Sequence, residues 1–248
     1  MADSDPTSFS KDSLNSHLIP NLPPSMYYIP SFITPSEEQS LLQKIPSNRW
    51  VQLSNRRLQA HPARLTANNT LLASSPLPNW LVNPVVERLH ALGVFDDAKG
   101  VNHCLVNEYE PGQGIMAHED GPAYHPVVAT VSLGGSTVLD ITTKPPLDSP
   151  SCQNDDAGDE TRPRTYRIFQ EPRSLLLTTS IAYTSTLHGI AEVSFDEDLN
   201  AGTVANWNLL GEKPEDGSRE RTTRVSLTFR EVLKVAKVGG KLFGKTRG

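Results

Sequence analysis

The sequence has 248 residues, 37% of them hydrophobic, and its 23 lysines and arginines against 28 aspartates and glutamates give a net charge of −5. This length suits one domain with a sizeable core, and the acidic balance gives no sign of a general nucleic-acid binder. Two widely separated cysteines argue against a disulfide framework and a structural zinc site, and the lack of a long apolar run argues against a membrane span.

The first 25 residues are rich in Ser, Asp, Asn and Pro and poor in large apolar side chains. Such a segment buries too little surface to offset the entropy of ordering it, so we predict a flexible arm over residues 1–25. These residues also lack the basic start and apolar run of a secretory signal. We therefore expect a protein of the cytoplasm and nucleus without a membrane partner. We also expect it to be a monomer.

Two helices are predicted in the first half of the chain. Thr34 and Glu37 form a capping box with proline between them at the first helical position, and leucines follow on one face. A second helix is predicted from Trp80 to Leu92, with Gly93 as its end. Pro84 is expected either to kink this helix or to reset its start.

Beyond residue 100 the pattern changes to short runs of Val, Leu, Ile and Thr separated by turn residues, which predict strands. The predicted strands cover residues 101–110, 126–133, 136–142, 165–169, 174–179, 183–190 and 223–231. This number of strands is typical of a sandwich or small barrel. We expect a mainly β fold with flanking helices (α+β), forming a single domain over residues 26–233.

The segment NEYEPGQGIMAHEDGP carries a candidate metal site. If residues 115–121 are extended, His118 and Asp120 point to one face and Glu119 to the other, so Glu119 is given no ligand role. His188 is the candidate third ligand. Two histidines and one carboxylate leave three coordination positions open, as in non-haem Fe(II) oxygenases. A short HxD pattern also arises among exposed polar residues, so it needs support from elsewhere.

That support comes from RVSLTFR, residues 224–230, which alternates strictly between polar and apolar side chains. Its polar face consists of Arg224, Ser226, Thr228 and Arg230. An exposed strand gives the same alternation as a strand whose polar face lines a site. Asn107 and Tyr109 form a similar polar pair just before the HxD motif, which favours the second interpretation.

Two further segments are set apart by charge. Residues 144–165 carry Pro, Ser, Asn and five acidic residues, and we predict a solvated loop inserted between two strands. Residues 234–248 form a basic tail, which is either a solubilising segment or a contact for an anionic partner.

The chain resembles the AlkB family of Fe(II) and 2-oxoglutarate dependent dioxygenases, and within it the sixth homologues of animals and plants. The resemblance rests on an NxY, an HxD, a distant histidine and an RxxxxxR in that order, between about residue 27 and residue 230. It implies a double-stranded β-helix, or jelly roll, with helices packed on it, that uses Fe(II), 2-oxoglutarate and dioxygen. The implied catalytic residues and iron ligands are His118, Asp120 and His188.

The resemblance also implies a co-substrate site. Arg224 would pair with the 5-carboxylate of 2-oxoglutarate, helped by Tyr109 and Asn107, and Ser226 stands where many relatives carry asparagine. Arg230 lies roughly 20 Å further along an extended strand, so it is expected to serve the metal end of the site.

The family's usual target is an N-methyl group on a flipped or single-stranded nucleotide, whose oxidation releases formaldehyde. RRLQAHP matches the position of a substrate lid, so Arg56, Arg57 and Gln59 are candidates for phosphate or base contacts, and Tyr124 for base stacking. A polar surface loop is the alternative for all four. RNA is favoured over DNA because the chain lacks a long basic recognition helix. Two other functions stay open: an RNA-binding module on the same fold with little turnover, and a protein-directed hydroxylase or demethylase.

Overall fold

The computed structural model describes residues 9–20, 22–23, 25–73, 75–95, 100–145 and 163–237, and within them most strands belong to two antiparallel sheets. The larger sheet contains β1 (Met26–Ile29), β10 (Leu175–Thr179), β7 (Val127–Gly134), β14 (Arg224–Arg230), β5 (His103–Tyr109), β3 (Arg57–His61) and β2 (Val51–Gln52), in that spatial order. The smaller sheet contains β6 (Ile115–His118), β11 (Thr186–Ile190), β8 (Thr137–Thr143) and β9 (Thr165–Gln170), in that order. The prediction of a mainly β fold with flanking helices is confirmed.

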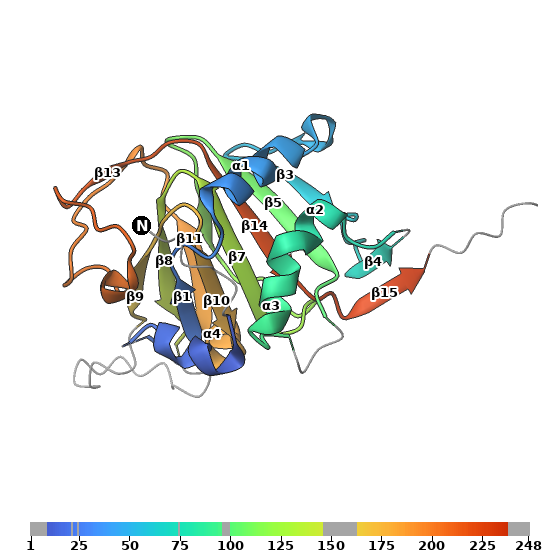
Figure 1. The fold of residues 1–248 in the computed structure, drawn as a ribbon, viewed down its shortest axis with the longest axis horizontal. Coiled ribbons are helices and arrows are strands. Elements are labelled where there is room, and N and C mark those ends of the chain that lie inside the picture. The colour runs from blue at the N-terminus through green and yellow to red at the C-terminus, as the bar shows by residue number, and fades with distance from the viewer. Residues whose placement is uncertain are drawn as a thin grey trace, which may run out of the picture.

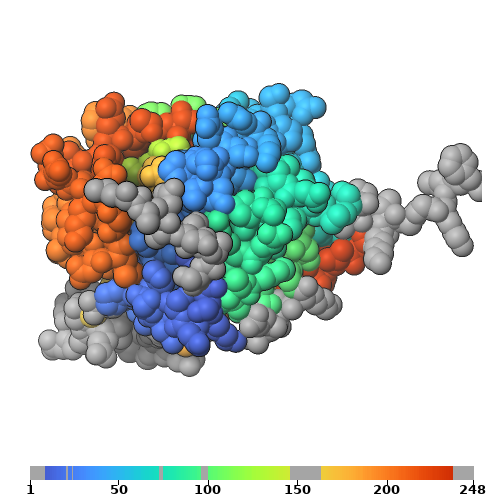
Figure 2. All heavy atoms as spheres, viewed as in Figure 1, coloured from blue at the N-terminus to red at the C-terminus, as the bar shows by residue number. Residues whose placement is uncertain are grey.

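Helices cover the outer face of the larger sheet (Figures 1 and 2). They are α1 (Pro35–Lys44), α2 (Asn79–Leu81) and α3 (Glu87–Ala91). Their buried leucines, such as Leu81 and Leu89, share one apolar cluster with Leu227 and Phe229 of β14. A second cluster joins the larger sheet to the smaller one. All seven residues of β14 are buried, so its alternation is that of a strand between two buried surfaces and not of an exposed one.

Both predicted helices begin or bend where the sequence indicates. The Thr34 hydroxyl accepts a hydrogen bond from the Glu37 amide at 3.2 Å, and the Glu37 carboxylate accepts one from the Thr34 amide at 2.8 Å. The second helix is interrupted by a π-helical turn, η3 (Val82–Val86). Asn83 leaves the helical region there, with φ −106° and ψ 122°, because the following Pro84 disfavours helical backbone.

The described part of the N-terminal segment is ordered, which differs from the flexible arm predicted for residues 1–25. A 3-10 helix, η1, spans Lys11–His17, and Ile19 is buried. The rings of Phe9 and Phe32 lie 5.2 Å apart, between centroids. The few apolar side chains of this segment are therefore spaced to reach the core, and their contacts offset part of the ordering entropy.

The strand predicted over residues 183–190 is wrong in its first part. The chain forms a short helix, α4 (Ser180–Ser185), before entering β11. The Ser185 hydroxyl donates to the Ile181 carbonyl at 2.6 Å, and the Thr186 hydroxyl donates to the Ala182 carbonyl at 2.7 Å. Such side-chain bonds let a segment rich in Ser and Thr satisfy helical carbonyls.

The acidic insert predicted over residues 144–165 lies outside the described residues except at its ends. The basic tail begins as a strand, β15 (Lys234–Lys237), which pairs in parallel with β4 (Thr70–Ala73), and the tail beyond it is outside the described residues. The remaining short elements are η2 (Ser47–Arg49), β12 (Phe195–Asp196), η5 (Trp207–Leu209) and β13 (Arg219–Glu220). Within the described residues, no helix has the length and apolarity that a membrane crossing requires.

Candidate metal and co-substrate site

A cavity of about 260 Å³ lies between the two sheets. The polar face of β14 forms one wall of this cavity, together with Asn107 and Tyr109 of β5. The opposite wall comes from β6, β8, β9 and β11 of the smaller sheet. Polar residues from strands far apart in the sequence therefore converge here, as their matched alternation predicted.

Three candidate ligands meet at one end of the cavity. His118 and His188 are directly paired between β6 and β11, with ring centroids 4.3 Å apart. Asp120 follows β6, and one ligand atom from each of the three residues lies within 4.8 Å of the others. In the described part of the chain no other cluster of His, Cys, Asp or Glu converges in this way. Glu119 borders the cavity, but its carboxylate forms an ion pair with Lys144 and is not part of the triad.

Hydrogen bonding and burial prepare both histidines for a metal. The Nδ1 atom of His118 lies 2.9 Å from the carbonyl oxygen of Met116, so a proton on Nδ1 can be donated there, which leaves the Nε2 lone pair free. Burial lowers the pKa of His188 to about 4, against a smaller opposing effect of Asp120. The His188 ring can therefore act as a neutral imidazole ligand near neutral pH, and the His118 ring can present its Nε2 atom to the same metal.

Arg230 lies at the metal end of the cavity. Its guanidinium forms an ion pair with Asp120, and both side chains are almost fully buried. The same guanidinium stacks on Tyr124, at 4.8 Å from the ring centroid. Arg230 therefore fixes one oxygen of the Asp120 carboxylate, which orients that group within the triad.

Arg224 lies at the other end of β14 and is only 3% exposed. Its Nη2 donates to the Ser132 hydroxyl at 2.9 Å and to the Gln170 side-chain oxygen at 2.5 Å, while its Nε has no hydrogen-bond partner among the described residues. Its guanidinium lies 6.0 Å from the Tyr109 ring centroid, and Ser226 lines the same wall. Burial lowers the pKa of Arg224 to about 10. A buried cation held only by neutral groups fits an anionic ligand, as the 5-carboxylate of 2-oxoglutarate would be.

Sequence reasoning missed Gln170 and Ser132, the two residues that hold Arg224. Gln170 is the last residue of β9 and shares its inward face with Ile168, which lies between the sheets. Alternation along β9 could have indicated that Gln170 faces inward. Its partner on the other sheet could not be read from the same pattern, because it depends on how the two sheets pack.

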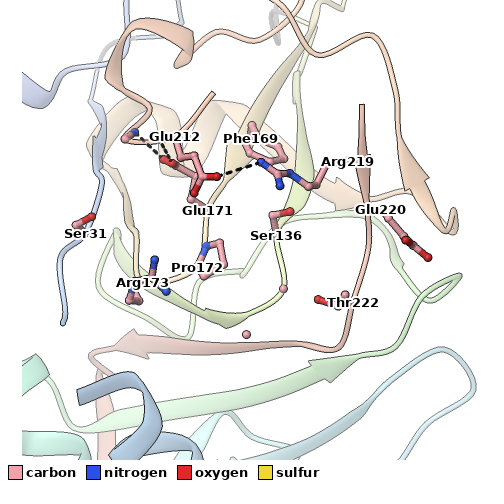
Figure 3. A pocket seen from close by; sticks show the side chains of 13 residues that line it. Ser31, Ser136, Phe169, Glu171, Pro172, Arg173, Glu212, Arg219, Glu220 and Thr222 are labelled. Atoms are coloured by element: carbon pink, nitrogen blue, oxygen red, sulfur yellow. Dashed lines mark hydrogen bonds and ion pairs between the residues drawn. The ribbon is translucent and has the colours of Figure 1, made fainter. Parts of the chain in front are cut away.

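A larger hollow of about 580 Å³ on the outside of the barrel has a different character. Figure 3 shows Glu171 bound to the backbone and Glu212 paired with Arg219. The Glu171 carboxylate accepts hydrogen bonds from the amides of Gly211 and Glu212 at 3.1 and 2.6 Å. Arg219 pairs with Glu212 at 3.9 Å. The buried carboxylate of Glu171 is therefore used to hold the surrounding loops together.

The four residues predicted to contact substrate are divided by the structure. Arg56 and Tyr124 line the cavity, and the Arg56 Nε donates to the Asn107 side chain at 3.3 Å. The prediction for Gln59 is wrong, because its side chain is buried and bound to the Pro46 carbonyl at 2.7 Å. Arg57 also points away from the cavity. It directly follows Arg56, which lines the cavity, and successive residues of an extended chain face opposite sides. It pairs with Glu108 and lies 4.6 Å from the Trp50 ring centroid.

Two histidines beside the site, His61 and His103, predict an acid-sensitive fold. Both are buried, and the pKa of each is lowered to about 4, first by burial and then by Arg49 and Arg230 respectively. The unfolded chain binds these protons near pH 6.5 and the folded chain does not, so stability falls as pH drops from about 6.5 to about 4. Urea unfolding of metal-free protein at about pH 7 and about pH 5 measures this loss. In a His103→Leu variant the free energy of unfolding should differ less between the two pH values than it does in the wild type. An unchanged difference in this free energy would contradict the prediction.

Comparisons with known proteins agree with this geometry. Residues 47–230 match the sequence model of the 2OG-Fe(II) oxygenase superfamily. The chain is 40% identical to the probable RNA/DNA demethylase ALKBH6 of Danio rerio over 227 residues, which is 90% of this chain and 92% of the relative. It is also 27% identical to the tRNA (carboxymethyluridine(34)-5-O)-methyltransferase alkbh8 of Xenopus tropicalis, covering 87% of this chain and 33% of that protein.

Among solved structures, OsALKBH1 aligns with 86% of this chain and 99% of its own, at a TM-score of 0.52 and 16% identity, which confirms the jelly-roll fold. The family match, the relative at 40% identity and the triad in the cavity support the same assignment. The chain therefore belongs to the AlkB family of the 2OG-Fe(II) oxygenase superfamily and is a dioxygenase that uses Fe(II), 2-oxoglutarate and dioxygen.

Proposed function

We propose that this dioxygenase removes N-methyl groups from nucleic acid, with single-stranded substrates and RNA favoured over duplex DNA. The names of two relatives support a nucleic-acid substrate, since one is a probable RNA/DNA demethylase and the other a tRNA methyltransferase. The observation that carries the proposal is an apolar groove that opens beside His118 and shares this residue with the cavity.

Each end of the cavity has its own role in this proposal. His118, Asp120 and His188 hold the iron, Arg230 orients Asp120, and Arg224 binds the 5-carboxylate of 2-oxoglutarate. Bound iron, with dioxygen, supplies the oxidation of a C–H bond while 2-oxoglutarate leaves as succinate and carbon dioxide. One oxygen atom enters the N-methyl group, and the resulting N-hydroxymethyl group breaks its C–N bond to release formaldehyde and leave N–H. The protein aligns the methyl group with the metal and shields the reaction from bulk water.

The groove has the shape and chemistry for a nucleobase. It measures about 730 Å³ and runs between residues 52–56 and strand β6. Leu53 and Met116 line it and are 37% and 86% exposed. Arg56 borders both the groove and the cavity, so its guanidinium stands between a base in the groove and one at the metal. Apolar side chains flanking a guanidinium suit the stacking of a base next to a phosphate.

The proposal is tested by following succinate and formaldehyde with Fe(II), ascorbate and 2-oxoglutarate. The substrates are N-methylated nucleosides, methylated single-stranded RNA and DNA, and methylated peptides, with His118→Ala as the control. Formaldehyde from an oligonucleotide above this control supports the proposal. Product from peptides alone would favour a protein-directed enzyme, and RNA binding without any succinate would favour a binding module.

The groove predicts a specific effect of Met116→Asp. This change removes a stacking surface and places a carboxylate where phosphates would pass, so KM for a methylated single-stranded oligonucleotide should rise at least about tenfold. Turnover of a methylated nucleoside, which does not extend into the groove, should change little. Leu72→Asp is the matched control, because Leu72 is 42% exposed on β4 and lies outside the groove. Equal effects of the two variants would refute a role for the groove.

A further inference from the structure

Gln170 and Ser132 form a closed network with Arg224. Gln170 lies at the end of β9 in the smaller sheet, and its Oε1 accepts from Arg224 Nη2 at 2.5 Å and from the Ser132 hydroxyl at 3.0 Å. The Ser132 oxygen accepts from the same Nη2 at 2.9 Å. Gln170 and Ser132 are 1% and 0% exposed. The network therefore joins the two sheets inside the barrel, where bulk water does not compete for these bonds.

The network leaves the charge of Arg224 without a neighbouring counter-ion among the described residues. The nearby Asp196 is engaged by Arg221, whose Nε and Nη2 donate to its two oxygens at 2.9 and 2.6 Å. Glu171 follows Gln170 in the chain, but its carboxylate accepts from the amides of Gly211 and Glu212 (Figure 3) and, at 2.7 Å, from the Tyr28 hydroxyl of β1. The carboxylate of Glu171 therefore lies away from Arg224, and the uncharged amide of Gln170 contacts it.

The side-chain amide nitrogen of Gln170 is available to a ligand. Its side chain borders the cavity, and within the described residues its Nε2 donates no hydrogen bond, while Oε1 accepts two. We propose that Gln170 is a positioning residue that selects a keto acid with a second carboxylate. Its oxygen fixes the Arg224 guanidinium, its free N–H donates to the carboxylate that Arg224 binds, and its neutrality leaves the guanidinium charge for that ligand. This inference rests on the proposed role of Arg224.

The test compares 2-oxoglutarate with 2-oxovalerate, which carries a methyl group in place of the 5-carboxylate. Binding of each acid is measured by calorimetry on protein loaded with Mn(II), so that no turnover occurs. Gln170→Glu has nearly the same shape but supplies an internal carboxylate to Arg224. It should weaken 2-oxoglutarate binding at least about tenfold, leave 2-oxovalerate binding unchanged, and leave the melting temperature unchanged or raised.

Two control variants separate the possible outcomes. Gln170→Met keeps the length without the amide and should weaken 2-oxoglutarate binding less than Gln170→Glu, because it adds no competing charge. The inference is overturned if Gln170→Glu keeps the wild-type preference, or if it weakens both acids equally with a loss of stability. Failure of Arg224→Met to reduce the preference would instead overturn the role of Arg224, and with it the basis of this inference.

Discussion

Replacing Asp120 with asparagine is expected to lower succinate formation by at least about a thousandfold, because an amide is a poor ligand for a metal otherwise held by two histidines. Metal content after dialysis against Fe(II) or Co(II) should fall in parallel. The two histidines stay in place in this variant, since they are paired between β6 and β11 and do not depend on Asp120 for their position. Retained metal and retained turnover would show that the triad is not the iron site.

Stability provides an internal control for this variant. Asp120 is the ion-pair partner of the buried Arg230, so its loss leaves a buried guanidinium without a counter-ion, at a cost of about 3–5 kcal/mol. The double variant Asp120→Asn with Arg230→Met removes that charge and should recover most of the free energy of unfolding, measured in urea. Turnover should stay absent. Recovery of activity together with stability would mean that the single variant failed only because it unfolded.

The sequence predicted the main features of the site because those features follow alternation along single strands. Arg224 and Arg230 share one face of β14, which required only a strand with period two. The HxD prediction assumed an extended chain to residue 121, whereas β6 ends at His118, yet Asp120 still reaches the same cavity. The coarse fold was likewise readable from the strand runs, with the helical turn of α4 as the main local error.

The features that depend on contacts between elements could not be predicted. Gln59 lies in a lid-like motif but faces Pro46 and His61, which only the packing of β3 against η2 reveals. The groove beside Met116 and the bond between Gln170 and Arg224 arise where separate segments meet. The cytoplasmic and nuclear location, the monomeric state and the domain limits stay predictions from the sequence.

The second large effect concerns two buried arginines three positions apart in the sequence. Arg221 and Arg224 are 5% and 3% exposed, but Arg221 is paired with the buried Asp196 and Arg224 is held by neutral groups. Breaking the first pair leaves Asp196 buried and uncompensated, so Arg221→Met should lower the free energy of unfolding by about 3–5 kcal/mol. Arg224→Met removes a buried charge that has no protein counter-ion, so the protein without 2-oxoglutarate should keep its stability or gain about 1 kcal/mol or more.

The effects of these two variants on 2-oxoglutarate binding should be the reverse of their effects on stability. Arg224→Met loses a charge-assisted contact to the 5-carboxylate, so KM for 2-oxoglutarate should rise about a hundredfold or more, whereas folded Arg221→Met protein should bind it nearly normally. Urea unfolding and calorimetry on the same two preparations measure both effects. A functional cation is thus distinguished from a structural one by opposite changes in stability and binding. Two variants that lose stability and 2-oxoglutarate binding to the same extent would show that Arg224 is merely structural.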